Sequence, residues 1–321
     1  MLDVLTFAAP IFLLIGLGFA AVRSGQFPAT GLPALATFVI RFALPALVFK
    51  ALSQRDFAEV LNARYLLAYT AGSLVIVLLG LAWARWGRGE DLERGAFVAM
   101  GMACSNSAFI GFPLAHQVIG ADAGIGLALC MVVENLLIIP LCLALADSGS
   151  ATHEPFSAAF GRALKGLPKN PLIVAIAAGF VCSMLRLPLP AALAKAVDLL
   201  AGASAAGALF FIGGTLVGLS MRSMAGEVLP VALGKLLLHP LAVAGALWLV
   251  GPVGPIAPTL AACAVLMAAA PMLSIYPIFA QRHGLQGLCS ARMVGTTLAS
   301  FVSIGIVLWV LRHGGLLALG G

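Results

Sequence analysis

The sequence predicts an all-α membrane protein in which ten transmembrane helices form two inverted repeats of five. Hydrophobic residues make up 62% of the 321 residues and charged residues only 9%, with a mean hydropathy of +1.09. A water-soluble globule of this length cannot bury so much apolar surface. Apolar stretches also recur along the whole chain, and two of them, one in each half, are similar and interrupted in the middle.

Ten stretches have about the 20 apolar residues that a helix needs to cross the hydrocarbon core of a bilayer. We expect spans at residues 5–22, 32–52, 65–86, 96–119, 123–146, 171–187, 193–219, 228–250, 258–281 and 288–311. Asp3 precedes the first span, which has neither a basic start nor a small-residue cleavage site. It is therefore expected to be a retained helix and not a removable signal peptide.

The most polar interruption lies near the centre of the chain and separates five spans from five. We therefore expect a first five-helix repeat at 1–146, a cytoplasmic linker at 147–170, a second repeat at 171–312 and a C-terminal tail at 313–321. An odd number of spans per repeat makes the second repeat enter the membrane in the opposite direction. Nine lysines and arginines fall in the loops of one face and six in those of the other, which places both termini outside.

The two similar stretches belong to the fourth and ninth spans. They read GMACSNSAFIGFPLAHQVIG at 101–120 and VLMAAAPMLSIYPIFAQRHG at 265–284, and without a gap Pro113 falls on Pro277. A matched pair of interrupted spans in the two halves of a membrane protein is typical of a transporter's binding site. The alternative is that each proline only kinks a packed helix.

Two registers of the helix breaks are open. In the first, short polar side chains compete for backbone hydrogen bonds in the fourth span, and a proline removes a donor in the ninth. In the second, the breaks follow the aligned residues Pro113 and Pro277, with Gly111 as a further residue at the break. The first register predicts a substrate site formed by Ser105, Asn106, Ser107, Pro271, Met272 and Ser274.

Helices broken at mid-depth survive only where protein or a hydrated cavity receives their free backbone groups. If the two broken spans cross, the second half-helix of each begins at the crossing. Their unsatisfied N–H groups, which carry a partial positive charge, then face the same small volume. Such a volume attracts an anion.

Ionisable side chains inside spans are the next candidates, because burying a charge costs at least about 2.5 kcal/mol on insertion scales. Glu134 lies deep in the fifth span, and Asn135 beside it can bind a ligand. Arg292 lies on the equivalent tenth span, so we expect it to approach Glu134. Either Glu134 carries a coupling proton, or the two residues form a static ion pair. Arg41 either meets an anionic substrate or extends to the membrane interface.

Four further residues have weaker assignments. Lys235 lies near the start of the eighth span and is expected to extend toward the interface. His239, just before a proline, is expected to pack in the protein. His116 and His283 lie near the ends of the two broken spans, where they offer a pH sensor.

Several function classes are excluded. The chain has no HExxH, GxSxG, P-loop or dinucleotide-binding glycine motif and no polar segment long enough for an ATPase domain, so we expect no enzymatic activity. The six cysteines lie in apolar stretches without CxxC spacing, so no metal site is expected. The net charge of +6 is spread over the loops without a basic run, which indicates a lipid bilayer and not nucleic acid as the partner.

Several stretches together resemble the auxin efflux carrier family, within the larger group that includes the bile acid sodium symporters. FVIRFALPALVFKALS resembles the second span of that family, KNPLIVAIAAGF the entry to the sixth, and AAAPMLSIYPIFAQRHG the ninth. The segment that begins LPLPAALAKAVDLLAG resembles the seventh. In SNSAFIGFPLAHQVIG the fourth-span pattern of the family maps to Asn106, Gly111, Pro113, Leu114 and Gly120.

The resemblance implies a scaffold domain of spans 1, 2, 6 and 7 and a transport domain of spans 3–5 and 8–10. The crossed fourth and ninth spans would hold the substrate and move against the scaffold like an elevator. The plant carriers have Asn-Pro-Asn at the crossing, whereas this chain has Cys104, Ser105 and Asn106, so only the last asparagine is kept.

We therefore expect a secondary transporter for a small organic anion, a mono- or dicarboxylate resembling malonate, in a bacterial inner membrane. A homodimer through the scaffold helices is expected, with no cofactor except a proton coupled through Glu134 and Arg292. One alternative is a sodium-coupled symporter resembling the bile acid carriers, although only Glu134 and Asn135 offer ligands for Na⁺. Another is a membrane receptor or scaffold that keeps the fold without transport.

Overall fold

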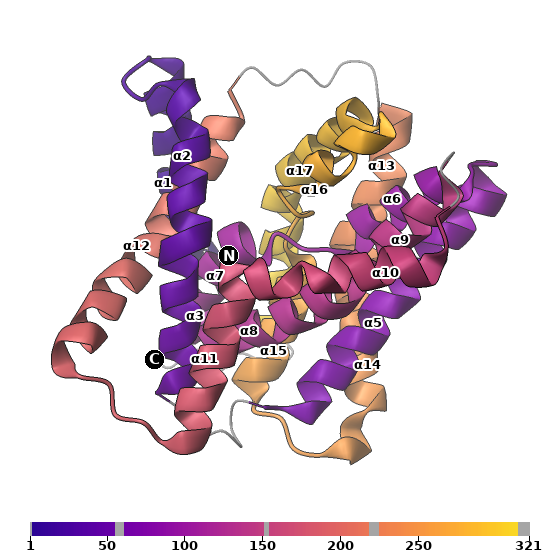
Figure 1. The fold of residues 1–321 in the computed structure, drawn as a ribbon. Coiled ribbons are helices and arrows are strands. Elements are labelled where there is room, and N and C mark those ends of the chain that lie inside the picture. The colour runs from indigo at the N-terminus through magenta and orange to yellow at the C-terminus, as the bar shows by residue number, and fades with distance from the viewer. Residues whose placement is uncertain (1, 55–60, 151–153, 218–224, 314–321) are drawn as a thin grey trace.

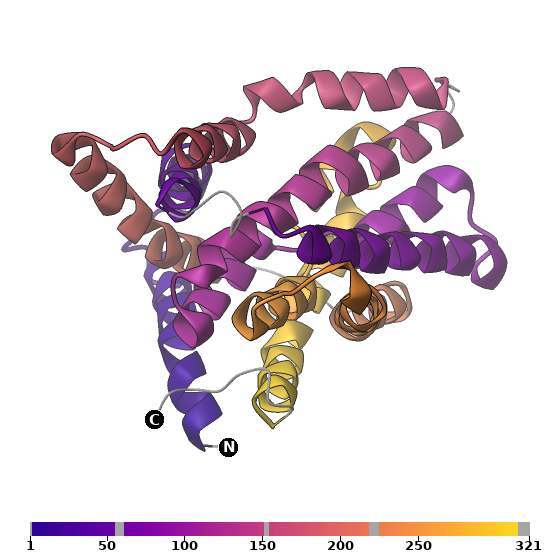
Figure 2. The same ribbon diagram turned by 90° about the horizontal axis from the view of Figure 1, so that it is seen from below.

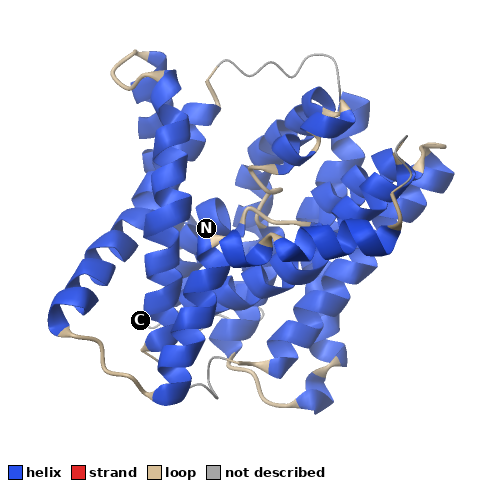
Figure 3. Cartoon of the chain, in the orientation of Figure 1, coloured by secondary structure: helices blue, strands red, loops and turns tan. Residues whose placement is uncertain are grey.

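The computed structural model describes residues 2–54, 61–150, 154–217 and 225–313. All regular elements in these ranges are helices (Figure 3). In chain order the α-helices are α1 (Leu2–Arg23), α2 (Leu32–Phe38), α3 (Leu44–Ser53), α5 (Ala63–Ala82), α6 (Leu92–Ala103), α7 (Phe112–Ile119), α8 (Asp122–Val133), α9 (Ile139–Gly149), α10 (Phe156–Lys165), α11 (Pro171–Leu185), α12 (Ala191–Thr215), α13 (Ala225–Leu233), α14 (His239–Leu249), α15 (Pro258–Ala269), α16 (Tyr276–Phe279) and α17 (Gln286–His313).

Six helical stretches in the described ranges are long and apolar enough to cross a membrane, or seven if the bent pair of α10 and α11 counts as one span. The six are Ala29–Ser53, Ala63–Gly87, Asp122–Gly149, Ala191–Thr215, Gly226–Leu249 and Gln286–His313. Shorter apolar helices lie in the first, fourth and ninth predicted spans. The chain is therefore an all-α membrane protein, with helix in each of the ten predicted stretches.

Wider π-helical turns interrupt several of these helices. Four of them end two residues before a proline: η2 (Val39–Ala43) before Pro45, η4 (Ser107–Gly111) before Pro113, η5 (Glu134–Ile138) before Pro140, and η7 (Gly234–Leu238) before Pro240. Proline lacks an N–H, and its ring clashes with the carbonyl of the preceding turn, so the helix widens there. The prolines of the sequence thus place Glu134 and Lys235 in widened turns in the middle of their helices.

The helices form two packed groups. One group consists of α1, α2, α3, α11 and α12, and the other is built around α5, α6, α9, α14 and α17 (Figure 1). Helices α7, α8 and α15 lie between them, with η4 against α12 and α8 against α3. In the first group α1 and α12 approach so closely at Gly18 that a Cβ there would lie only 2.1 Å from the carbonyl oxygen of Phe210. Small residues permit such close packing of membrane helices.

The predicted linker contains a helix that the span analysis does not predict. Helix α10 runs alongside α9 at one edge of the molecule (Figure 2), and the chain bends by 66° between Phe156–Lys169 and α11. Ala159 is buried on its inner side, whereas Phe156 and Lys165 are exposed. It is therefore an amphipathic helix that connects the two halves of the chain.

Candidate functional site

The fourth and ninth predicted spans are both broken in the middle of the protein. Helix α6 ends at Ala103, and helical structure resumes at Ser107 with η4 and α7. Helix α15 ends at Ala269, and α16 begins at Tyr276. The breaks therefore follow the first of the two registers.

The two breaks contact each other. Ser105 and Met272 form an isolated antiparallel β-bridge. The backbone N–H of Asn106 donates to the carbonyl of Pro271 at 2.7 Å, and that of Leu273 donates to Cys104 at 3.3 Å. We call these two extended segments, residues 104–106 and 270–275, the crossover. Each broken span thus satisfies some of its free backbone N–H and C=O groups through hydrogen bonds to the other.

The prolines of the second register lie just beyond the crossover. Pro113 is the second residue of α7 and Pro277 the second residue of α16. Pro277 therefore lies in the first turn of its helix, where a missing N–H costs little. Pro113 lies inside the continuous helix of η4 and α7, directly after the widened turn. Gly111 ends η4, and a Cβ there would lie 2.9 Å from the sulfur of Met267 on α15. It therefore lets the two broken helices approach each other.

The two half-helices that follow the crossover are unequal. Segments η4 and α7 form a continuous helix over Ser107–Ile119. By contrast, α16 has four residues and leads into a short 3₁₀ turn at Gln281–His283. A helix macrodipole needs several aligned turns. The expectation of two opposed N-termini is therefore wrong, and one positive helix end, that of η4–α7, begins at the crossover.

Asn106 connects the two halves of the crossover through its side chain. Its Nδ2 donates to Ser274 Oγ at 2.6 Å. Its Oδ1 is buried and accepts no hydrogen bond from the described part of the chain. Leaving a buried acceptor without a donor costs about 1–3 kcal/mol. Asn106 therefore has free capacity for a donor, and Ser274 is half-buried beside it.

A network of buried polar side chains lies beside the crossover. We call it the Lys235 network; its members are Tyr69, Ser73, Ser105, Glu134, Lys235 and His239, all fully buried. The Nζ atom of Lys235 donates to Ser105 Oγ at 2.7 Å and to the carbonyl of Ala268 at 2.7 Å. It lies 2.8 Å from Nδ1 of His239. The expectation that Lys235 extends to the membrane interface is therefore wrong.

The tautomer of His239 follows from its two neighbours. An ammonium group has only protons to offer, so Nδ1 of His239 accepts from Lys235. Its Nε2 then carries the ring proton and donates to Ser73 Oγ, 3.0 Å away. The packed histidine expected from the sequence thus has a polar partner on each ring nitrogen.

Glu134 belongs to the same network. Its Oε1 accepts from the backbone N–H of Ser105 at 2.9 Å and from the Tyr69 hydroxyl at 3.0 Å. Its Oε2 is buried and has no hydrogen-bond partner in the described ranges. Glu134 therefore faces the crossover with one oxygen still open.

Arg292 does not meet Glu134. It lies near the start of α17, where its Nη2 is 3.1 Å from Glu227 Oε2 on α13. Glu134 instead lies in the middle of the α8–η5–α9 helix. Equivalent helices therefore carry the two charges at different depths, and the expected approach is wrong.

Two other predicted site residues point elsewhere. Arg41 is exposed on the surface of η2. Asn135 donates from its amide to the carbonyl of Met131 on its own helix at 2.9 Å. Ser107, by contrast, is buried at the start of η4, with its hydroxyl 3.1 Å from the sulfur of Cys130.

The two end histidines lie in different surroundings. His116 lines a cavity of about 290 Å³ between α7 and α12, near an ion pair of 2.7 Å between Lys50 and Asp198. His283 contacts Glu93 through Nδ1 at 2.6 Å.

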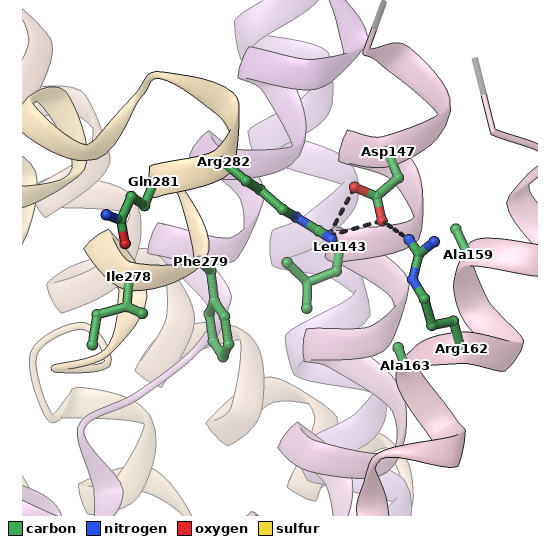
Figure 4. Close-up of a pocket in the computed structure, with 9 residues that line it drawn as sticks. All are labelled: Leu143, Asp147, Ala159, Arg162, Ala163, Ile278, Phe279, Gln281 and Arg282. Carbon is green, nitrogen blue, oxygen red and sulfur yellow. Dashed lines mark hydrogen bonds and ion pairs between the residues drawn. The ribbon is translucent and has the colours of Figure 1, made fainter. Parts of the chain in front are cut away.

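A cluster of charged side chains around Asp147 joins α9 to α10 and to the turn that contains Arg282. Asp147 lies in the last turn of α9 and pairs with Arg162 of α10 at 2.6 Å and with Arg282 at 2.8 Å (Figure 4). The three residues border a cavity of about 600 Å³ that Leu143 and Phe279 also line. The hydrogen bond to Glu154 and the charge of Asp147 raise the pKa of Arg162. We call Asp147, Arg162 and Arg282 the Asp147 cluster.

Sequence reasoning missed Tyr69, Ser73 and the burial of Lys235. One signal was present, because Lys235 and His239 are four residues apart on one helix face just before a proline. In the described ranges no group of three or more His, Cys, Asp or Glu side chains could hold a metal ion.

Comparison with known proteins agrees with this architecture. A family model described as "Membrane transport protein" matches residues 3–308. A protein of Rhizobium meliloti (strain 1021) named "Putative malonate transporter" is 29% identical over 318 residues, which cover 98% of each chain. Since the match extends over nearly the whole chain, this protein belongs to the membrane transport protein family, as its resemblance to the auxin efflux carriers predicts.

Proposed function

We propose that the protein is a secondary transporter for a small organic anion and that the anion binds at the crossover. The observation that carries this proposal is the amide N–H donor of Asn106, placed at the start of the η4–α7 helix within the crossover. A helix N-terminus favours negative charge. The name of the relative from Rhizobium meliloti supports malonate or a similar mono- or dicarboxylate as the substrate.

Binding would use donors from both halves of the crossover. A carboxylate accepts from the first-turn N–H groups of η4, as an anion does at other helix N-termini. The Asn106 amide and the Ser274 hydroxyl now bond each other at 2.6 Å and would turn to the carboxylate. If the substrate's other end is a protonated carboxylic acid, its O–H would donate to Oδ1 of Asn106, which has no donor within the described ranges. A second carboxylate would instead accept from the Ser107 hydroxyl. Pro271 and Met272 shape the wall of this volume.

We propose alternating access by an elevator motion. The packed group of α1, α2, α3, α11 and α12 would be the stationary scaffold and the dimer interface. The remaining helices would carry the crossover and slide against it along η4 and α12, where Phe109 and Phe211 are in ring contact at 5.3 Å. Ten spans in two inverted repeats, at 1–146 and 171–312 with the linker at 147–170 and the tail at 313–321, are part of this proposal.

Coupling to a proton would take place at Glu134. Its open Oε2 can accept a proton, and the residue contacts the crossover through the N–H of Ser105. Arg292 has no role in that step, since Glu227 is its partner. The setting that we propose is a bacterial inner membrane with both termini outside.

Uptake into proteoliposomes tests the proposal. The purified protein would be reconstituted and supplied with radiolabelled malonate, other dicarboxylates and indole acetate, with imposed pH and Na⁺ gradients in separate arms. We expect saturable malonate uptake that Asn106→Ala abolishes. Ser303→Ala on α17 is a matched control for the loss of a small polar contact, because Ser303 bonds only its own helix at Ser300. Undiminished uptake by both Asn106→Ala and Ser274→Ala in correctly inserted protein would refute the site.

A further inference from the structure

We propose that the ammonium group of Lys235 occupies a site built for a monovalent cation and that this built-in cation makes transport independent of Na⁺. The inference rests on the proposed function, because it assigns the charge balance of the same crossover. It also separates this chain from the sodium-coupled alternative.

Two of the three atoms that contact the Lys235 ammonium are oxygens of the kind that coordinates an alkali cation, and the third is His239 Nδ1. Nζ lies 2.7 Å from the carbonyl oxygen of Ala268 and 2.7 Å from Ser105 Oγ. Ala268 is the last residue but one of α15, so its carbonyl belongs to the negative end of a half-helix. Carbonyls at such ends and in unwound segments coordinate Na⁺ in secondary transporters. In this chain a side chain brings the positive charge to that place.

The Glu134 carboxylate lies on the other side of Ser105 from the Lys235 ammonium. The hydroxyl of Ser105 accepts from Lys235, and its backbone N–H donates to Glu134 Oε1 at 2.9 Å. One residue thus joins the buried cation to the buried anion. Glu134 is fully buried and its Oε2 has no hydrogen-bond partner in the described ranges. An unbalanced buried carboxylate is costly, so a positive charge nearby stabilises the ionised form of Glu134.

Lys235 is not placed to hold the substrate itself. An ammonium has three protons. Ser105 Oγ, the Ala268 carbonyl and His239 Nδ1 lie at 2.7, 2.7 and 2.8 Å and take all three. His239 is held in turn by Ser73 at 3.0 Å. The Lys235 ammonium is therefore held in place beside the crossover, whereas Asn106 Oδ1 still has no hydrogen-bond donor in the described ranges.

Removal of the lysine side chain tests the inference without any substrate. Lys235→Ala leaves the Ser105 hydroxyl, the Ala268 carbonyl and His239 Nδ1 around an empty volume, with the Glu134 carboxylate on the other side of Ser105. Lys235→Met fills that volume with an uncharged chain and is the matched control. The melting temperature of the full-length protein in detergent would be measured in NaCl and in choline chloride at equal ionic strength. We expect Na⁺ to raise the Tm of Lys235→Ala and to leave those of Lys235→Met and the wild type unchanged.

Uptake gives the second readout. We expect malonate uptake by the wild type to be the same in Na⁺ and in choline, and uptake by Lys235→Ala to be lost in choline and regained in Na⁺. A Tm of Lys235→Ala that is equal in both salts would overturn the inference, and so would Na⁺-stimulated uptake by the wild type. Since the Tm shift needs no transport, a shift without anion uptake would refute the proposed function and leave the cation site standing.

A third comparison keeps the test open if Lys235→Ala does not fold. The double variant Lys235→Met/Glu134→Gln removes both buried charges, and a neutral pair is tolerated better than one uncompensated charge. We expect its folded yield, measured by fluorescence size-exclusion chromatography, to exceed that of Lys235→Met. An equal or lower yield would show that Lys235 does not balance Glu134 and would overturn the inference.

Discussion

Ser105 from the first half of the chain and Met272 from the second form an antiparallel bridge in the middle of the helical bundle. The bridge joins two half-spans whose backbones are free of helical hydrogen bonds at that depth. It places Asn106 at the start of η4 and, through Ser105, brings the Lys235 network against the same segment. The proposed anion site and the buried Lys235 ammonium are therefore connected through one segment of the crossover.

The bridge depends on a close approach between η4 and α15. Gly111→Ala places a Cβ 2.9 Å from Met267 Sδ and 3.4 Å from Ala270 Cβ. The Met267 side chain can shift, so we expect a stability loss near the lower end of the range of about 1–3 kcal/mol for overpacking, together with reduced malonate uptake. Gly245→Ala on α14, where nothing lies within 4 Å of the new Cβ, is the control. Equal melting temperatures and uptake rates for the two variants would contradict the packing at the crossover.

The Tyr69 hydroxyl holds the Glu134 carboxylate. Tyr69→Phe removes that donor and leaves Oε1 with the N–H of Ser105 alone, which costs about 1–3 kcal/mol because the acceptor is buried. Tyr65→Phe is the matched control, since Tyr65 stacks on Tyr69 and donates to the carbonyl of Gly126 at 2.9 Å. We expect both variants to lower Tm, but only Tyr69→Phe to change the response of uptake to an imposed pH gradient. The same response in both would remove Glu134 from the coupling step.

Much of this architecture could be predicted from the sequence. Apolar length placed the helices, and the polar run around Asn106 and the isolated Pro271 located the breaks, because both features act on the local backbone. The position of Lys235 could not be predicted, since Ser105 and Ala268 are 130 and 33 residues away. Such long-range partners convert an expected interfacial lysine into a buried one.

The partner of Arg292 and the helix inside the linker could not be predicted either, for different reasons. Arg292 was matched with Glu134 because their helices are equivalent, but depth along the helix decided the pairing, and Glu227 lies closer. Helix α10 lies within the predicted linker, and span analysis does not predict it because it is too short and too polar to cross a membrane. A search by apolar length does not detect an amphipathic helix of this kind, in which Ala159 is buried and Phe156 exposed.

Asp147 holds α10 against the rest of the protein. Asp147→Asn weakens its pairs with both Arg162 and Arg282. Each pair contributes less than about 1 kcal/mol, because the arginine side chains are half-exposed. We therefore expect faster tryptic cleavage at Arg162 with little change in Tm, measured by mass spectrometry over time. Glu154→Gln, which spares Arg282, should accelerate cleavage less, and identical cleavage of wild type and Asp147→Asn would show that the Asp147 cluster does not hold α10.

The packed group of α1, α2, α3, α11 and α12 depends on the close contact of α1 with α12. Gly18→Ala drives a Cβ to 2.1 Å from the Phe210 carbonyl oxygen, whereas Gly16→Ala on the same helix meets nothing within 4 Å. We expect Gly18→Ala to lower Tm by several degrees, since backbone cannot move aside as a side chain can, and Gly16→Ala to leave it unchanged. Thermal unfolding in detergent checks this, and equal Tm values would contradict the packing of the two helices.

Locating a bound anion tests the central claim most directly. A structure of the protein with bromomalonate, in which anomalous scattering marks the bromine, would show where the dicarboxylate binds. We predict a bromine peak beside Asn106 and the first turn of η4. A peak elsewhere in the protein, or none at the crossover while bromomalonate competes with malonate for uptake, would contradict this account.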